Sequence, residues 1–311
     1  MTTALSAFRR RRGRDAIQPS TPASPPRTSR SRNRFQHGLL VGLLTLLAVL
    51  VAVAFALPAI WMLLGSLRPG SQVIESVSPL GWQTLIPDTW TLDNYRALFF
   101  ELRFGRSMIN SLFVALASVL IGLALSVPAA YALTVLRFRG REFLFALLVI
   151  GFMIPFEAIA IPLAQVFTQW HLNNSYLGLI LPGIGNGLAI FNLRQFFLGI
   201  PGSLREAAVI DGASDFRIMT RIYVPLSVTS LINSGLLIFL AQWSSYLWPL
   251  LIVSDESKQV APIAIARTYT DTEFNFGQMF GGALLISIVP AVLLLFLQRF
   301  FAATIASSGE K

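Results

Sequence analysis

The sequence contains no cysteine among its 311 residues, only two histidines and only two lysines. The absence of cysteine excludes disulfide bonds and thiolate metal sites. His37 and His171 are far apart along the chain, so we expect no metal site built from histidines. Neither Lys258 nor Lys311 belongs to a glycine-rich loop ending in Gly-Lys. The chain therefore lacks that type of phosphate-binding loop and is not expected to hydrolyse ATP by that route.

Charged residues are also scarce, at 13% of the chain against 54% hydrophobic residues. This composition is too apolar for an ordinary soluble domain of this length. A membrane-spanning helix requires about 20 apolar residues. The sequence therefore predicts an all-α integral membrane protein with six transmembrane helices, which lie at 39–67, 107–136, 143–167, 176–198, 227–253 and 277–303.

Prolines recur inside these six apolar runs. In lipid, the carbonyl groups that a proline leaves without a donor must be satisfied by neighbouring helices or by water. We therefore expect a bundle of helices around a path rather than isolated anchors. The prolines concerned are Pro58, Pro128, Pro155, Pro162, Pro182 and Pro290.

The formal net charge of +9 is concentrated at the N-terminus, where residues 1–36 hold nine arginines and only one acidic residue, Asp15. This segment is rich in Pro and Ser and has no apolar period, which predicts a disordered cytoplasmic tail. Such a tail suits membrane orientation and lipid headgroups better than nucleic acid. The predicted organisation is then the tail, a six-helix domain at 37–305, and a short cytoplasmic tail at 306–311.

The distribution of positive charge also predicts the orientation in the membrane. With the N-terminus inside, the inside segments carry eighteen Lys and Arg and the outside loops carry six. This bias agrees with the positive-inside rule. We therefore expect a multi-pass protein of the cytoplasmic membrane with both termini inside, and with residues 199–226 in an inside loop.

This inside loop, residues 199–226, is the most informative stretch of the sequence, and we call it the knob. Ser203, followed three residues later by Glu206, forms the pattern of a capping box that starts a short helix. Gly212 can adopt the left-handed conformation that ends such a helix. On local patterns alone, Glu206 can simply cap the helix and Asp211-Gly212 can simply turn the chain.

A second short helix is expected to follow in the same loop. Ser214 can cap it, Ile218 and Ile222 would share one face, and Pro225 would end it. Two exposed short helices with one apolar face form a surface suited to the groove of a partner.

The knob also resembles the cytoplasmic "EAA" loop of ABC importer permeases. The resemblance is carried by Glu206-Ala207-Ala208, by Asp211-Gly212-Ala213, and by Ile222 with Pro225-Leu226. The wider chain, over residues 40 to 303, is similar to the carbohydrate branch typified by the second permease of maltose-type importers. The supporting matches are Thr91-Leu92-Asp93-Asn94-Tyr95, Asn110-Ser111, Ala130-Tyr131-Ala132, Arg137-Phe138-Arg139-Gly140-Arg141 and Tyr176-Leu177-Gly178-Leu179.

The chain departs from the family pattern at three places. Position 224 is Val where Leu is usual, Thr229 stands where proline is common, and Trp243-Ser244 replaces a frequent Trp-Asn pair. The first departure is conservative, and the other two lie at the start and in the middle of the fifth run.

The resemblance implies the type I importer arrangement in a prokaryotic cytoplasmic membrane, and a non-catalytic subunit. It implies an ABC ATPase dimer that binds ATP and Mg²⁺, a second homologous permease, an extracytoplasmic solute-binding protein, and a sugar or sugar-like substrate. The chain itself would need no cofactor or metal. The alternative is a permease of the same superfamily for a glycerol-phosphate-type solute or an amino acid. The residues matching the ATPase-coupling motif are Glu206, Ala207, Ala208, Asp211, Gly212, Ala213, Ile222 and Pro225.

Residues of the solute path are harder to identify. Glu157 is an acidic residue within a predicted span, where a charge requires a partner or water. Polar side chains in the spans can bind hydroxyl groups but can equally lock helix to helix. Trp243, Tyr246 and Trp248 can stack on a sugar ring, and Trp248 can equally lie at the membrane interface. The candidates are Glu157, Asn110, Asn186, Asn192, Gln242, Trp243 and Tyr246.

A membrane enzyme and a passive channel are the alternatives from other classes. An enzyme would require paired catalytic groups at one membrane face, such as a nucleophile with a base, and the sequence has no such constellation. A channel would have no use for a loop that docks an ATPase.

Overall fold

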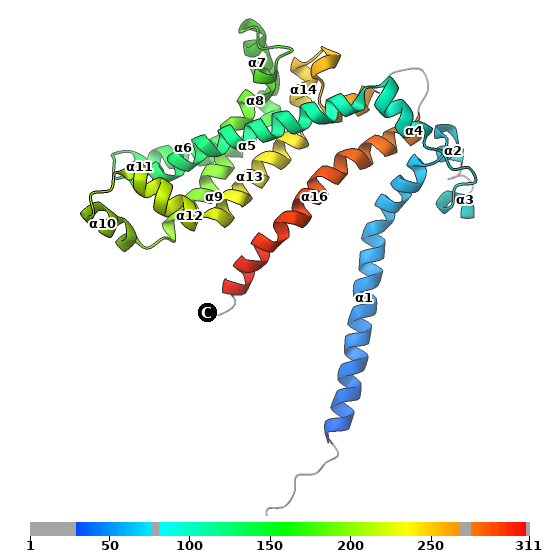
Figure 1. Ribbon diagram of the computed structural model, residues 1–311, viewed down its shortest axis with the longest axis horizontal. Coiled ribbons are helices and arrows are strands. Elements are labelled where there is room, and N and C mark those ends of the chain that lie inside the picture. Colours follow the sequence, from blue (N-terminus) through cyan, green and yellow to red (C-terminus); the bar gives the residue numbers. More distant parts are fainter. Residues whose placement is uncertain (1–28, 76–80, 268–274, 309–311) are drawn as a thin grey trace, which may run out of the picture. The chain divides into compact units, whose positions relative to one another are not determined.

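The computed structural model describes residues 29–75, 81–267 and 275–308, and every regular element within these residues is helical (Figure 1). The chain divides into two compact units, residues 1–56 and 57–311. The predicted tail falls outside the described residues up to position 28, and the first helix begins at Ser29, before the boundary predicted at 37.

The α-helices follow one another without strands in the described residues. They are α1 Ser29–Ser66, α2 Gly70–Glu75, α3 Trp82–Leu85, α4 Asp93–Arg96, α5 Phe104–Thr134, α6 Arg141–Met153, α7 Phe156–Gln169, α8 Tyr176–Ile184, α9 Gly187–Leu198, α10 Gly202–Ile210, α11 Asp215–Ile218, α12 Val224–Leu226, α13 Val228–Trp243, α14 Leu247–Ile252, α15 Ala261–Arg267 and α16 Phe276–Ser308. Short π-helical turns cover Ala97–Glu101 and Met219–Tyr223, and a 3-10 turn covers Glu256–Lys258.

Four segments of the described chain are long and apolar enough to cross a membrane as single spans. They are Gly38–Ser66, Phe104–Thr134, Tyr176–Leu198 and Phe276–Phe300, and each coincides closely with a predicted run. Two further pairs of helices pass the same test but are sharply bent, so the total is four to six spans. The prediction of an all-helical membrane protein is confirmed.

The predicted third span, residues 143–167, is not one continuous helix. It is divided into α6 and α7, which meet at an angle of 93°. The break lies at Ile154 and Pro155, where both residues have extended ψ angles. Proline lacks an N–H and disfavours helical conformation in the preceding residue, which accounts for the break. The other prolines of the predicted spans lie inside helices, namely Pro58, Pro128, Pro162, Pro182 and Pro290.

The predicted fifth span, residues 227–253, is also divided between two helices. Helix α13 ends at Trp243, and a separate short helix, α14, begins at Leu247. At its other end, α13 meets the segment Asp215–Leu226 at 85°. An apolar run therefore predicted an apolar helical segment correctly but carried no information on where the backbone changes direction.

Helix α5 lies at the centre of the second unit, against α8, α9 and α13. Small residues allow the close approach of α5 and α13. A Cβ atom added at Gly122 would lie 3.0 Å from Ile238 Cδ1, and one added at Gly235 would lie 3.3 Å from Leu123 Cδ1. Small residues at helix interfaces are typical of membrane bundles, where helices associate through close packing.

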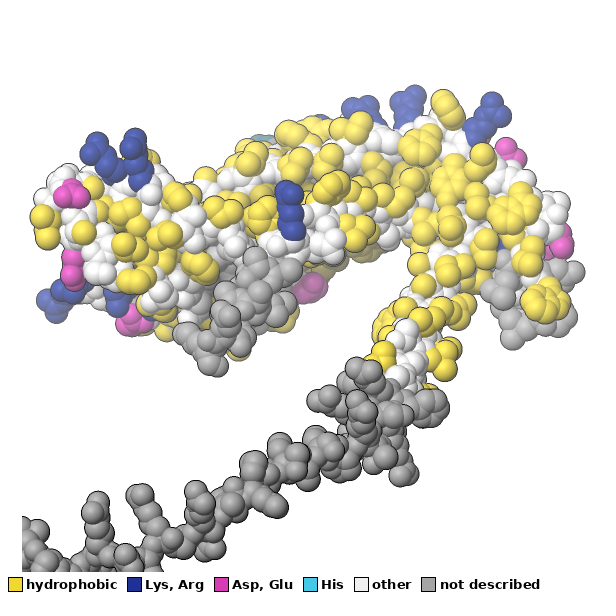
Figure 2. Space-filling view, turned by 60° about the horizontal axis from the view of Figure 1, so that its bottom comes forward, with side chains coloured by type: hydrophobic (Ala, Val, Ile, Leu, Met, Phe, Trp, Pro, Cys, Tyr) yellow, Lys and Arg dark blue, Asp and Glu magenta, His cyan; other side chains and the backbone are white. Residues whose placement is uncertain are grey.

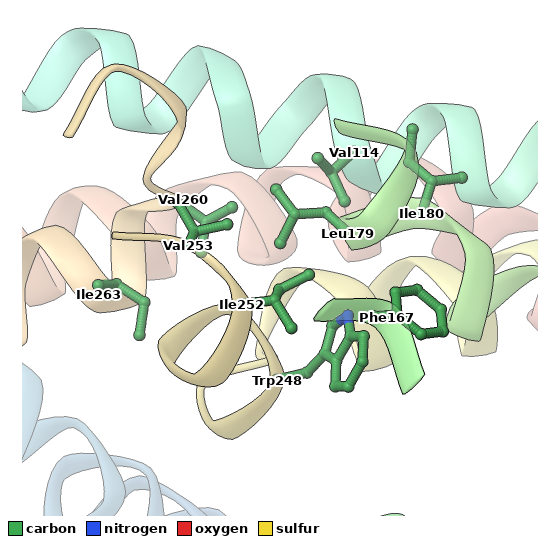
Figure 3. Close-up of a cluster of buried hydrophobic side chains, with 9 residues drawn as sticks. All are labelled: Val114, Phe167, Leu179, Ile180, Trp248, Ile252, Val253, Val260 and Ile263. Carbon is green, nitrogen blue, oxygen red and sulfur yellow. The ribbon is translucent and has the colours of Figure 1, made fainter. Parts of the chain in front are cut away.

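A second packing region joins α14 to α7 and α8. Figure 3 shows the side chains of Trp248 and Phe167 close together, and their ring centroids lie 4.9 Å apart in an edge-to-face arrangement. The Trp248 indole Nε1–H also donates to the Gly178 carbonyl at 3.0 Å. Trp248 is only 3% exposed, so its ring has no free face on which a sugar could stack.

Candidate functional site

The first helix of the knob, α10, begins differently from the sequence prediction. Its N-cap is Pro201, which makes no side-chain cap, and the helix runs from Gly202 to Ile210. Ser203 therefore lies inside the first turn and does not form the predicted capping box with Glu206. Proline has a fixed φ near −65° and starts the helix before Ser203 reaches a capping position.

The turn that follows α10 confirms the prediction made for Gly212. Its φ angle is +75°, in the left-handed region, and its N–H donates to the Val209 carbonyl at 3.0 Å. The N–H of Ala213 donates to the Ala208 carbonyl at 2.9 Å. Together these hydrogen bonds satisfy carbonyl groups that the end of α10 would otherwise leave unpaired.

The second helix of the knob begins as predicted and ends slightly later. The Ser214 hydroxyl accepts a hydrogen bond from the Arg217 N–H at 3.4 Å. The helical chain then continues through a π-helical turn and passes Pro225 to end at Leu226. Pro225 lies in the first turn of α12, where its missing N–H costs little, and so it does not end the helix.

The knob has one face packed against the bundle. Ile218 and Tyr223 are buried at 1% and 3% exposure, and they pack with Tyr131 of α5 and Phe197 of α9. Ala208, Ala213 and Ile222 are partly buried against the same cluster. Ile218 and Ile222 therefore share a face, as predicted.

The opposite face of the knob is exposed and mixes apolar with charged side chains. Ile210 is 85% exposed and Phe216 is 72% exposed. Of the predicted coupling residues, Glu206, Ala207, Asp211, Gly212 and Pro225 are also exposed. Figure 2 shows hydrophobic, basic and acidic side chains gathered at the left end of the molecule, where Figure 1 places α10 and α11.

Polar contacts reinforce the attachment of the knob to α5. The Tyr131 hydroxyl donates to Asp215 Oδ1 at 3.0 Å, and the Arg205 guanidinium lies 3.3 Å from the same oxygen. Burial lowers the pKa of Arg205, but its interactions with Tyr131 and Asp215 outweigh this and hold the pKa above its ordinary value. One carboxylate thereby joins α5, α10 and α11.

A buried arginine fixes the same end of the bundle. Arg194 of α9 is 7% exposed, and its Nε–H donates to the Leu133 carbonyl at 3.2 Å. Its guanidinium also pairs with Glu142 at 3.2 Å and lies 3.7 Å from the centroid of the Phe145 ring. These contacts hold the end of α5 against α6 and α9.

Most polar candidates for the solute path are engaged within the chain. Asn110 donates to the Ser257 and Gln259 carbonyls at 3.1 and 2.8 Å. Asn186 caps α9 by accepting from the Ala189 N–H at 2.9 Å. These contacts favour a role in joining structural elements.

Three further candidates, Asn192, Gln242 and Trp243, also have partners inside the bundle. The Asn192 amide donates to Ser234 Oγ at 2.8 Å, and the Gln242 amide donates to Ser118 Oγ at 2.8 Å. Trp243 is 2% exposed, and its indole N–H donates to the Ile286 carbonyl at 3.1 Å. A buried ring in this position has no free face for a sugar.

Glu157 and Tyr246 differ from the other candidates because both side chains are exposed. Glu157 lies in the first turn of α7, directly after the break at Pro155. It makes no hydrogen bond or ion pair with any of the residues that the structure describes. Its carboxylate is therefore available to water, to solute or to another subunit.

The sequence patterns missed a polar cavity of about 1070 Å³. It lies at the N-terminal end of α5, away from the knob, which contacts the C-terminal end of this helix. Arg103, Arg106 and Asp255 line it. Hydrogen bonds from the Ser257 side chain and N–H lower the pKa of Asp255. No group of three or more potential metal ligands occurs within the described ranges.

The comparisons with known proteins agree on one family. Residues 118–307 match the family described as "Binding-protein-dependent transport system inner membrane component". The arabinooligosaccharides transport system permease protein AraQ of Halalkalibacterium halodurans is 33% identical over 88% of this chain and 97% of its own length. The sn-glycerol-3-phosphate transport system permease protein UgpE of Brucella suis is 32% identical over 84% of this chain and 94% of its own length.

A solved structure supports the same fold. It is the crystal structure of a bacterial ABC transporter involved in the import of the acidic polysaccharide alginate. One of its chains is 25% identical to this chain, with a TM-score of 0.71. The alignment covers 89% of this chain and 100% of that chain.

Proposed function

Because the chain belongs to the family of binding-protein-dependent transport system inner membrane components, we propose that it is a membrane-spanning permease subunit of an ATP-driven importer for a sugar or sugar-like solute. The observation that carries this proposal is the knob. It presents Glu206 and exposed apolar side chains outward while its inner face is packed on α5 and α9.

The energy for import comes from other subunits in this proposal. An ABC ATPase dimer binds ATP and Mg²⁺ and seats the knob in a groove, so that closure of the dimer displaces the knob. A rigid element moved in this way can switch a transporter between inward and outward access. Glu206 pairs with a basic group of the ATPase, and Gly212 sets the bend between the two helices. This subunit is accordingly non-catalytic.

The remaining partners complete the transporter. A second, homologous permease shares the solute path, and an extracytoplasmic solute-binding protein delivers the solute. The chain lies in the cytoplasmic membrane of a prokaryote with both termini inside, which places the knob in the cytoplasm beside the ATPase. The positive-inside distribution of Lys and Arg supports this orientation.

A sugar is favoured over a glycerol-phosphate-type solute by the names of two relatives and by the pairing of a buried cation in the bundle. AraQ is named for arabinooligosaccharides, and the alginate transporter takes part in the import of an acidic polysaccharide. Arg194, a buried cation in a spanning segment, is already paired with Glu142. The alternative is a glycerol-phosphate-type solute, which the name of UgpE keeps open.

Reconstitution into vesicles with the ATPase, the second permease and the binding protein tests this function. We expect ATP-dependent accumulation of a radiolabelled oligosaccharide, and none when the ATPase is omitted. Accumulation without the ATPase would contradict the proposal. Accumulation of sn-glycerol 3-phosphate but not of sugars would support the alternative substrate.

The exposure of Glu157 leads to a prediction about the solute path. We expect Glu157→Gln to raise the apparent KM for uptake by roughly tenfold to a hundredfold, the effect of losing about one hydrogen bond to a charged group. Gln242→Ala should instead reduce the amount of assembled transporter, because Gln242 joins α13 to Ser118 of α5. Competition uptake assays at matched protein levels separate the two effects, and an unchanged KM for Glu157→Gln would assign this residue no contact with solute.

A further inference from the structure

The hydroxyl group of Tyr131 lies in the contact between the knob and the bundle, and its role can be tested separately from the packing of the ring. Tyr131 is 3% exposed and lies near the inner end of α5. Its ring packs edge-to-face on Tyr223 at 5.1 Å, which would hold the ring in place without any hydroxyl. The hydroxyl adds a hydrogen bond to Asp215, a residue 84 positions away in the sequence.

Asp215 stands at the junction of the two knob helices. It is the first residue of α11, directly after the cap Ser214, and its carboxylate also binds Arg205 of α10. A force applied to either helix of the knob therefore acts on Asp215. The only spanning helix that the described polar contacts of Asp215 reach is α5, through Tyr131.

Helix α5 continues from this contact to the opposite end of the bundle. It has 31 residues, which corresponds to a length of about 46 Å at 1.5 Å per residue. Near its other end, Asn110 donates to the Ser257 and Gln259 carbonyls, and the Ser111 hydroxyl accepts from the Ala261 N–H at 2.8 Å. One helix thus connects the knob with the loop that lines the polar cavity.

We propose that the Tyr131 hydroxyl and the Asp215 carboxylate form a latch that makes α5 follow the knob, so that displacement of the knob by the ATPase reaches the opposite end of the bundle. Tyr131 is then a positioning residue. Pro128 lies three residues before Tyr131 and removes one backbone hydrogen bond of α5, so the last turn of α5 depends on such side-chain contacts to stay aligned with the knob. The proposal rests on the function proposed for the knob.

The substitution Tyr131→Phe tests the latch because it removes only the hydroxyl. The measurement is the number of ATP molecules hydrolysed per solute molecule imported by the assembled transporter in vesicles. We expect this ratio to rise about tenfold, the factor corresponding to a hydrogen bond with a charged group. The amount of assembled complex should remain unchanged, since the ring still fills the apolar cluster.

Tyr223→Phe is the matched control. Tyr223 lies in the same cluster at the same 3% exposure, and its hydroxyl makes no hydrogen bond within the part of the chain that the structure describes. The ratio should stay at the wild-type value. A rise as large as that of Tyr131→Phe would overturn the latch, because it would assign the effect to general packing.

A double-mutant cycle with Asp215→Asn separates the latch from independent effects. If the two groups act together, the double variant should be no more uncoupled than the stronger single variant. Additive effects, or an unchanged ratio for Tyr131→Phe, would overturn the latch. If Gly212→Pro raises the ratio while Tyr131→Phe does not, only the latch fails; if neither raises it, the function proposed for the knob fails as well.

Discussion

Replacement of Gly212 by proline is expected to reduce solute uptake by at least about tenfold while ATP hydrolysis continues. Gly212 has a φ of +75°, which the proline ring cannot adopt, and its N–H donates to Val209. Proline would remove this hydrogen bond and force the turn into another shape, at a cost of about 3 kcal/mol or more. Every 1.4 kcal/mol is about a tenfold change in population, so the native bend between α10 and α11 would become rare.

Gly202→Pro provides a matched control in the same loop. Gly202 is the first residue of α10, and a Cβ added there meets no atom within 4 Å. Proline is well tolerated at the first position of a helix. Uptake and hydrolysis should both remain close to wild type in this variant. Normal uptake by Gly212→Pro, at an equal amount of protein in the membrane, would show that the bend of the knob is not needed for coupling.

The substitution Ile210→Asp is expected to release the ATPase from the complex. Ile210 is 85% exposed at the end of α10, and burial of an isoleucine side chain in a partner contributes about 1.5–3 kcal/mol. An aspartate would lose this contribution and would also carry a charge into an apolar contact. We expect the ATPase affinity to fall by roughly tenfold to a hundredfold, measured by co-purification and by titration of the ATPase.

Trp82→Asp is the corresponding control. Trp82 is 82% exposed but lies in a loop predicted on the other side of the membrane. The affinity of the Trp82→Asp variant for the ATPase should equal that of the wild type. Equal losses from the two variants would mean that an exposed apolar residue anywhere in the chain affects assembly, and the assignment of the ATPase surface to the knob would be wrong.

Local chemistry decided which details of the knob were predictable from the sequence. The positive φ of Gly212 and the cap formed by Ser214 follow from residues within one turn of each other. The capping box at Ser203 was wrong because its pattern matches wherever Ser precedes Glu by three residues, whereas the start of the helix is determined by Pro201.

The sequence predicted the position and composition of the apolar segments, but not the direction of the backbone within them. The length of an apolar run indicates whether a segment is favourable in lipid. It does not depend on the direction of the backbone, so it could not predict the 93° and 85° bends found in the structure. The same limitation affected the aromatic candidates. Trp243 is a residue type that often binds sugars. Whether its ring faces a cavity or the core, however, depends on neighbours that are distant in the sequence, such as Ile286.

The latch could not be predicted for the same reason. Tyr131 belongs to a motif, Ala130-Tyr131-Ala132, that supported the family resemblance. Its partner Asp215, however, lies just beyond the Asp-Gly-Ala part of the loop motif, and only the packing of α11 on α5 brings the two side chains together. Sequence patterns identified the exposed face of the knob more readily than the contacts that attach the knob to the bundle.

Site-specific cross-linking is the most direct test of the claim that the knob receives the force of a separate ATPase. The chain has no cysteine, so one introduced by Ile210→Cys would be unique in it. We expect this cysteine to cross-link to the ATPase, and one introduced at the 64% exposed Trp170 to react only with reagents added outside the cell. Labelling of position 210 from the outside, with ATPase cross-links formed at position 170 instead, would contradict the account.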